Sequence, residues 1–131
     1  MKAELAQKPD LVFMSQVFFD SGVALTDAEI QKLVEATPAS TLFVLDGYHG
    51  FAAIPTVLSK LEGKIFYLGG GYKYAQGGEG VGLMVVPRGQ WRPAYTGWFA
   101  EYGHLSHPPG TQVGYSEDAM AFMGATQDPS G

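Results

Sequence analysis

Apolar residues gather in short blocks along the chain, and polar turn residues separate the blocks. The first block, Leu11–Phe19, is nearly uninterrupted in apolarity and is broken only by Ser15 and Gln16. It ends at Asp20-Ser21-Gly22, which is a turn signal. An apolar run of this length predicts a strand that is covered on both faces.

Two helices are predicted after this strand. Thr26 and Glu29 have the spacing of a capping box and precede an apolar face, which predicts a helix over about Asp27–Ala36. Pro55 suits a first helical turn, so Ile54–Leu61 is predicted to form a second, short helix.

Three further apolar blocks predict strands at Thr41–Leu45, Lys64–Leu68 and Leu83–Val86. Strands that alternate with helices are typical of an α/β fold, with a mostly parallel sheet flanked by helices. Ligands of such sheets bind outside the carboxyl ends of the strands. This edge of the sheet is therefore where candidate functional residues are expected.

The remainder of the chain, from about residue 88 to 131, has scattered Gly, Pro, Tyr and Trp and no clear period. Within it, Ser116–Met123 is a candidate for a short helix. The 131 residues suffice for one domain with a core, so we expect one domain with a loop-rich C-terminal part.

The composition narrows the possible functions. Asp and Glu number 13 against 8 Lys and Arg, which gives a net charge of -5 and argues against nucleic-acid binding. No cysteine is present, which excludes disulfides and thiolate chemistry.

No apolar run approaches the roughly 20 residues of a membrane span, so we expect a cytoplasmic protein with no membrane partner. His104 and His107 have a spacing that a metal could use, but nothing nearby completes a ligand set, and we expect no metal.

Three residues could carry chemistry. Lys73 follows a predicted buried strand and lies among glycines and tyrosines. In an apolar pocket, its free amine could form a Schiff base. The alternative interpretation is a solvated lysine in a loop. Asp46 ends a strand and needs a partner if buried, although such residues are commonly caps or turns. His49, three residues later, could stack on a ring or be structural.

Taken together, these segments resemble the cofactor site of a known family. The matching residues are Val44-Leu45-Asp46-Gly47-Tyr48-His49-Gly50, Gly71-Tyr72-Lys73-Tyr74 with the following Gly77–Gly82, and Thr96-Gly97-Trp98-Phe99. This pattern is similar to that of fold type I pyridoxal-phosphate enzymes, and most closely to the class V aminotransferase family with its kynureninase branch. The resemblance runs from about Leu11 to Pro129 and implies the large domain of such an enzyme.

The resemblance implies a catalytic role for two residues. Lys73 would hold the aldehyde of pyridoxal 5'-phosphate as an imine and later move protons at the substrate carbon. Asp46 would pair with the pyridine nitrogen and keep it protonated, which makes the ring an electron sink. His49 would lie beside the ring and support that nitrogen or Asp46.

It also implies residues that contact the cofactor phosphate. These residues are Tyr72, Trp98 and Thr126. Trp98 and Thr126 would reach the phosphate from the neighbouring subunit of a homodimer. The substrate would be an amino acid, which is either transaminated or cleaved at a carbon-carbon bond.

Members of the family are much longer than this chain, so the sequence is expected to be an incomplete excerpt of the large domain. Two alternatives remain open from the residues alone. One is a truncated, non-catalytic α/β module. The other is a small phosphometabolite-binding domain that uses the glycine segment as an anion nest.

Overall fold

A computed structural model describes residues 2–61, 63–104, 106, 108 and 114–124. The chain divides into two compact units, Met1–Pro87 and Arg88–Ser130. No helix within the described residues is long and apolar enough to cross a membrane.

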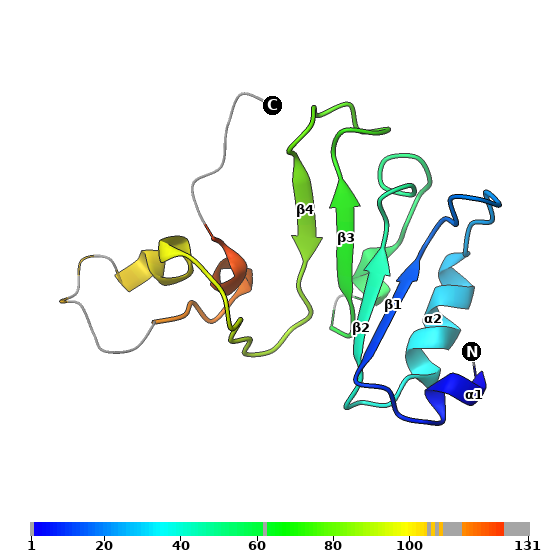
Figure 1. The fold of residues 1–131 in the computed structure, drawn as a ribbon, viewed down its shortest axis with the longest axis horizontal. Helices are drawn as coiled ribbons and strands as arrows, with labels where there is room; N and C mark the ends of the chain where they lie inside the picture. The colour runs from blue at the N-terminus through cyan, green and yellow to red at the C-terminus, as the bar shows by residue number, and fades with distance from the viewer. Residues whose placement is uncertain (1, 62, 105, 107, 109–113, 125–131) are drawn as a thin grey trace. The chain divides into compact units, whose positions relative to one another are not determined.

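The first unit is an α/β layer structure. Its elements are α1 (Lys2–Leu5), β1 (Leu11–Ser15), α2 (Asp27–Ala36), β2 (Leu42–Asp46), the 3-10 helix η1 (Leu58–Lys60), β3 (Phe66–Gly70) and β4 (Gly82–Val85). The four strands form one open sheet in chain order (Figure 1). Strands β1, β2 and β3 are parallel, and β4 runs antiparallel to β3. The prediction of an α/β fold with a mostly parallel sheet is confirmed at this level.

Helix α2 has the bounds that the sequence predicts. The Thr26 hydroxyl accepts a hydrogen bond from the Glu29 backbone N–H at 3.3 Å, and the Glu29 carboxylate accepts one from the Thr26 N–H at 2.9 Å. This capping box satisfies two donors that the first turn cannot pair internally. Ile30 and Val34 are buried against the sheet.

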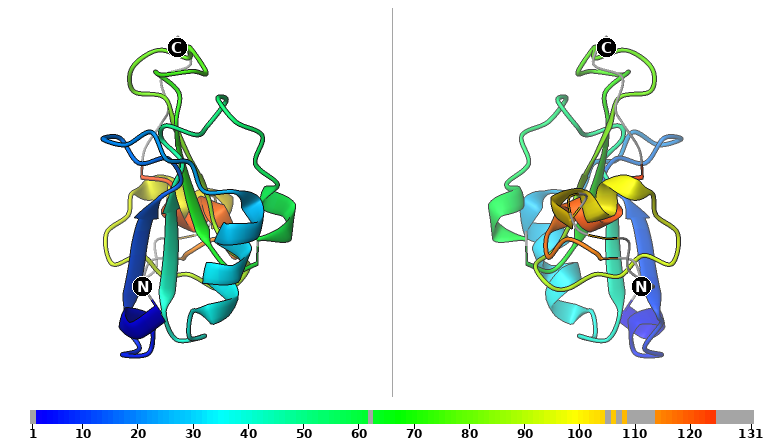
Figure 2. Two further views of the ribbon diagram at one scale, coloured as in Figure 1. Left: turned by 90° about the vertical axis from the view of Figure 1, so that its right-hand side faces the viewer. Right: turned by 90° about the vertical axis from the view of Figure 1, so that its left-hand side faces the viewer.

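The core lies between α2 and one face of the sheet. Figure 2 shows α2 and η1 on the same side of the strands. The buried core residues are Met14, Ile30, Val34, Phe43, Leu45, Leu61, Ile65 and Tyr67. On the opposite face of β1, Leu11 and Phe13 are 52% and 58% exposed. The expectation that this strand is covered on both faces is therefore wrong, because α2 packs on the side of Met14 while alternate residues point the other way.

Strand β1 is also shorter than predicted. The strand ends at Ser15, and a single antiparallel bridge joins Val17 to Ala24. The Phe18 N–H donates to the Val23 carbonyl at 2.9 Å, and Gly22 supplies the left-handed backbone of the turn with φ +68°. The end of the apolar run therefore belongs to a tight turn over residues 17–24 and not to the sheet.

The predicted helix over Ile54–Leu61 is wrong, since only the short η1 forms there. Val57 has a non-helical backbone, with φ -90° and ψ 76°, and its N–H donates to the Asp27 carboxylate at 3.2 Å. Ile54 closes an earlier turn, with its N–H bonded to the Gly50 carbonyl at 3.0 Å. A local turn and a hydrogen bond to Asp27, 30 residues away, are thus found where the helix was predicted.

The other three predicted strands exist with small shifts of their ends. Strand β2 begins and ends one residue later than predicted, β3 two residues later, and β4 one residue earlier. Because of these shifts, Asp46 is the last residue of β2, and Gly70 is the last residue of β3.

Among its described residues, the second unit contains two 3-10 helices, η2 (Trp98–His104) and η3 (Ala119–Phe122). The predicted helix over Ser116–Met123 is present only as η3. Its N-cap is Asp118, whose carboxylate accepts from the Met120 N–H at 2.9 Å. Nothing in the sequence pattern predicted η2. Gly97 lies directly against the Gly124 carbonyl, where a side chain would clash.

Candidate functional site

The carboxyl ends of the parallel strands bring three predicted site residues to one edge of the sheet. Asp46 ends β2 and pairs in register with Ser15 at the end of β1. Lys73 follows the end of β3 by three residues, and His49 follows the end of β2 by the same number. Figure 1 shows the arrowheads of β1, β2 and β3 pointing to this edge.

The amine of Lys73 is in contact with the imidazole of His49, between Nζ and Nε2. The half-buried Lys73 also has two tyrosines beside it: Nζ is 5.8 Å from the ring centroid of Tyr48 and 5.6 Å from that of Tyr72. The two tyrosine rings meet edge to face at 5.4 Å. Aromatic faces stabilise a cationic amine, and an imidazole nitrogen can accept its proton. Lys73 is therefore not a freely solvated loop lysine.

His49 is held from a second side by Phe19, whose ring centroid is 5.4 Å from that of the imidazole. With Lys73 as the donor to Nε2, the imidazole carries its own proton on Nδ1. In this arrangement His49 faces the lysine, whereas the resemblance implies a position beside the cofactor ring.

The carboxylate of Asp46 has two hydrogen-bond donors. Its Oδ1 accepts from the Tyr48 backbone N–H at 2.9 Å, and its Oδ2 is 3.5 Å from the Ser15 hydroxyl. The first of these is an Asx turn, so Asp46 does act as a turn residue. A carboxylate offers about four acceptor positions, so capacity for a further donor remains.

A buried polar network packs against Gly47 and Gly50, in the turn that follows Asp46. Gln16 is 1% exposed; its Nε2 donates to the Thr56 hydroxyl at 2.7 Å, and its Oε1 accepts from the Tyr67 hydroxyl at 3.3 Å. Neither Gln16 nor Tyr67 is predicted from the sequence to have a functional role. The signal that could have found Gln16 is its amide group inside an apolar run, because a buried amide requires partners.

Burial raises the pKa of Tyr67, and the negative charge of nearby Asp46 raises it further. The folded state therefore disfavours the ionised phenol relative to the unfolded chain, whose tyrosines ionise near pH 10. The stabilisation is fully present below about pH 10 and is lost as the pH rises through the higher pKa of the folded state.

We expect Tyr67→Phe to weaken the alkaline destabilisation of the protein. The midpoint of thermal unfolding should fall between pH 9 and pH 11 in both proteins, but less steeply in the variant, because one raised pKa has been removed. The variant is less stable at every pH, since Gln16 loses its donor, so the slope is the quantity to compare. Parallel curves would show that Tyr67 makes no such contribution.

The remaining predicted site residues are Tyr72, Trp98 and Thr126. Tyr72 is 44% exposed and contacts Tyr48 and Lys73 as described. Trp98 belongs to η2 in the second unit, where its ring packs on Phe99 with a centroid distance of 4.3 Å. Thr126 lies outside the described residues. Within the described ranges, no group of three or more His, Asp or Glu side chains could hold a metal.

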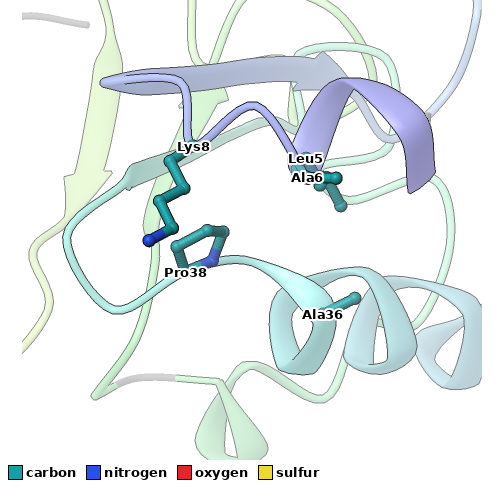
Figure 3. A pocket seen from close by; sticks show the side chains of 5 residues that line it. All are labelled: Leu5, Ala6, Lys8, Ala36 and Pro38. Atoms are coloured by element: carbon teal, nitrogen blue, oxygen red, sulfur yellow. The ribbon is translucent and has the colours of Figure 1, made fainter.

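A shallow pocket of about 290 Å³ lies elsewhere on the first unit. Figure 3 shows its lining residues, which are Leu5, Ala6, Lys8, Ala36 and Pro38. These residues precede β1 and β2 in the chain, so the pocket is near the amino ends of the parallel strands. It contains none of the predicted site residues.

No family model matches the chain, and no curated protein matches it. Functional inference therefore rests on the residues at the carboxyl-end edge of the sheet and on their geometry.

Proposed function

We propose that this chain is the catalytic-lysine segment of a pyridoxal-phosphate-dependent enzyme acting on an amino acid, of the class V aminotransferase or kynureninase-like type. In this proposal, the complete enzyme is a cytoplasmic homodimer. The observation that carries it is the contact of Lys73 Nζ with His49 Nε2 at the edge where Asp46 also ends its strand.

The chemistry of these groups fits the cofactor. Lys73 supplies an amine that can bind an aldehyde, and a neighbouring imidazole can take the proton that this amine must lose. Asp46 retains acceptor capacity for a protonated ring nitrogen. When bound, pyridoxal phosphate supplies an electron sink for the charge left at the substrate's α-carbon.

Each residue then has a defined task in the proposal. Lys73 attaches the cofactor through Nζ and later moves a proton at the α-carbon of the substrate. His49 accepts a proton from Lys73 Nζ, and Asp46 keeps the ring nitrogen protonated. Tyr72 binds the phosphate, and by family resemblance Trp98 and Thr126 contribute from a neighbouring subunit.

The anion-nest alternative has less support, because the glycine segment uses several of its own amides. The N–H of Gly71 donates to the Val81 carbonyl at 2.7 Å, and that of Gly77 donates to the Gly71 carbonyl at 2.7 Å. The N–H of Gln76 donates to the Lys73 carbonyl at 3.2 Å. A nest needs successive amides that are free to bind an anion.

The proposal is tested by adding pyridoxal 5'-phosphate to the purified chain, recording the visible absorbance, and reducing with borohydride. We expect a yellow protein whose colour is lost on reduction, with a phosphopyridoxyl group fixed on Lys73. Mass spectrometry of peptides locates the label. In Lys73→Arg, which keeps the positive charge but has no amine that can bind the aldehyde, labelling should fall to background.

The exposed Lys60 and Lys64 serve as internal controls for nonspecific labelling. A label on either of them with none on Lys73 would overturn the assignment of Lys73. A chain that develops no chromophore would favour the non-catalytic α/β module.

A further inference from the structure

We propose that Gln16 is a positioning residue that fixes the segment Asp46–Phe51 so that His49 faces Lys73. Gln16 acts through its neighbours and contacts neither Lys73 nor a cofactor. This inference rests on the proposed function for its catalytic meaning, while the positioning itself is a property of the chain alone.

The backbone of Gln16 connects two segments at the functional edge. Its N–H donates to the Asp46 carbonyl at 2.8 Å, which extends the pairing of β1 with β2 by one bond beyond the strands. Its carbonyl accepts from the Leu25 N–H at 2.8 Å. Gln16 is thus hydrogen-bonded to Asp46, where the segment begins, and to Leu25, which directly follows the turn that contains Phe19.

The side chain of Gln16 adds two partners from other parts of the chain. The Tyr67 hydroxyl on β3 donates to Oε1, and Nε2 donates to the Thr56 hydroxyl, which itself lies 3.4 Å from the Ile54 carbonyl. A carboxamide has one accepting end and one donating end, so these two partners fix which way the group points. Among the described residues, no buried side-chain nitrogen or oxygen lacks a partner.

The segment lies directly against this network. A side chain at Gly50 would overlap the Gln16 carboxamide, and one at Gly47 would overlap the ring of Tyr67. The segment is also closed on itself, since the Phe51 N–H donates to the Gly47 carbonyl at 2.7 Å. Because His49 stands between these two glycines, its position depends on where the network holds them.

A merely structural role would be served as well by an apolar side chain. Replacing a buried hydrogen-bonded group and its partners by apolar groups of similar shape can be nearly neutral for stability. A polar network instead specifies one arrangement of the groups that it joins. The readout that distinguishes the two roles is therefore the environment of His49 and not stability alone.

The test uses the full chain without cofactor and three variants. Thr56→Val removes one partner of Gln16 at nearly constant shape, Thr56→Ser restores the hydroxyl, and Gln16→Leu removes the amide. We expect Thr56→Val and Gln16→Leu to increase amide hydrogen exchange at Gly50 and Phe51 about tenfold. The ¹⁵N resonance of His49 Nε2, assigned by its loss in His49→Asn, should shift in both, and Thr56→Ser should match the wild type.

The positioning role is overturned if Thr56→Val and Gln16→Leu leave the His49 resonance unchanged, or if exchange rises equally in α2, which signals general destabilisation. These measurements are independent of cofactor labelling. If His49 responds as expected while Lys73 remains unlabelled by pyridoxal phosphate, the proposed function fails and the positioning role of Gln16 stands. If Lys73 is labelled but His49 does not respond, the positioning role fails alone.

Discussion

Replacing Asp46 by asparagine is expected to lower the rate of α-proton exchange by the pyridoxal-phosphate-loaded chain by about 100-fold or more. The reason is that, in the proposed site, the carboxylate charge would stabilise the protonated ring nitrogen, and therefore the charge that develops in the transition state. Asparagine keeps an oxygen that can accept from the Tyr48 N–H, so the turn is preserved. The measurement is the loss of the α-proton signal of L-alanine in deuterium oxide, followed by NMR.

Asp46→Ala is the matched variant, because it removes both the charge and the turn acceptor. It should lose the same activity and, in addition, about 1 kcal/mol of folding stability. An asparagine variant that exchanges the proton as fast as wild type would reduce Asp46 to a turn residue. Wild-type exchange no faster than that of free cofactor would contradict the enzymatic role of the chain.

Gly47→Ala is expected to destabilise the first unit by about 3 kcal/mol or more. The added methyl group would overlap the buried ring of Tyr67. The backbone cannot move aside easily, because the Gly47 N–H donates to the Leu68 carbonyl of β3 at 2.8 Å. Thermal or urea unfolding, followed by circular dichroism, measures the loss.

Gly63→Ala provides the control for this substitution. A methyl group at Gly63 would meet no atom within 4 Å, and the residue does not have a left-handed backbone. Its effect on the free energy of unfolding should stay within about 1 kcal/mol, because the reduced freedom of the unfolded chain acts in the stabilising direction. Equal losses in the two variants would contradict the packing of Gly47 against Tyr67.

Local signals in the sequence predicted part of the fold well. The capping box of Thr26 and Glu29 involves residues three apart, so its pattern is visible in the sequence and α2 has the predicted bounds. The helix predicted around Pro55 failed for the opposite reason. The Val57 N–H is paired with Asp27, 30 residues away, and no local pattern reveals such a partner.

The candidate site was predictable to the extent that it depends on parallel strands. Asp46 ends β2 and Lys73 follows β3, and parallel pairing brings the carboxyl ends of these neighbouring strands to one edge. The contact between His49 and Lys73 was not foreseen, because it depends on how the turn after Asp46 folds. That turn is shaped by Gln16 and Tyr67, which the sequence shows only as polar groups within apolar runs.

The strands lie in the sheet in the same order as in the chain, and this affects how the protein can fold. The pairing residues Leu11 and Leu42 are 31 positions apart, Val44 and Phe66 are 22 apart, and Gly70 and Gly82 are 12 apart. Each of these strands can therefore add to the free edge of a sheet that is already formed, with progressively shorter loops to close. Folding can follow synthesis from the amino end. Once the chain has grown just past Lys73, every residue of the edge that carries Asp46 and His49 has been made.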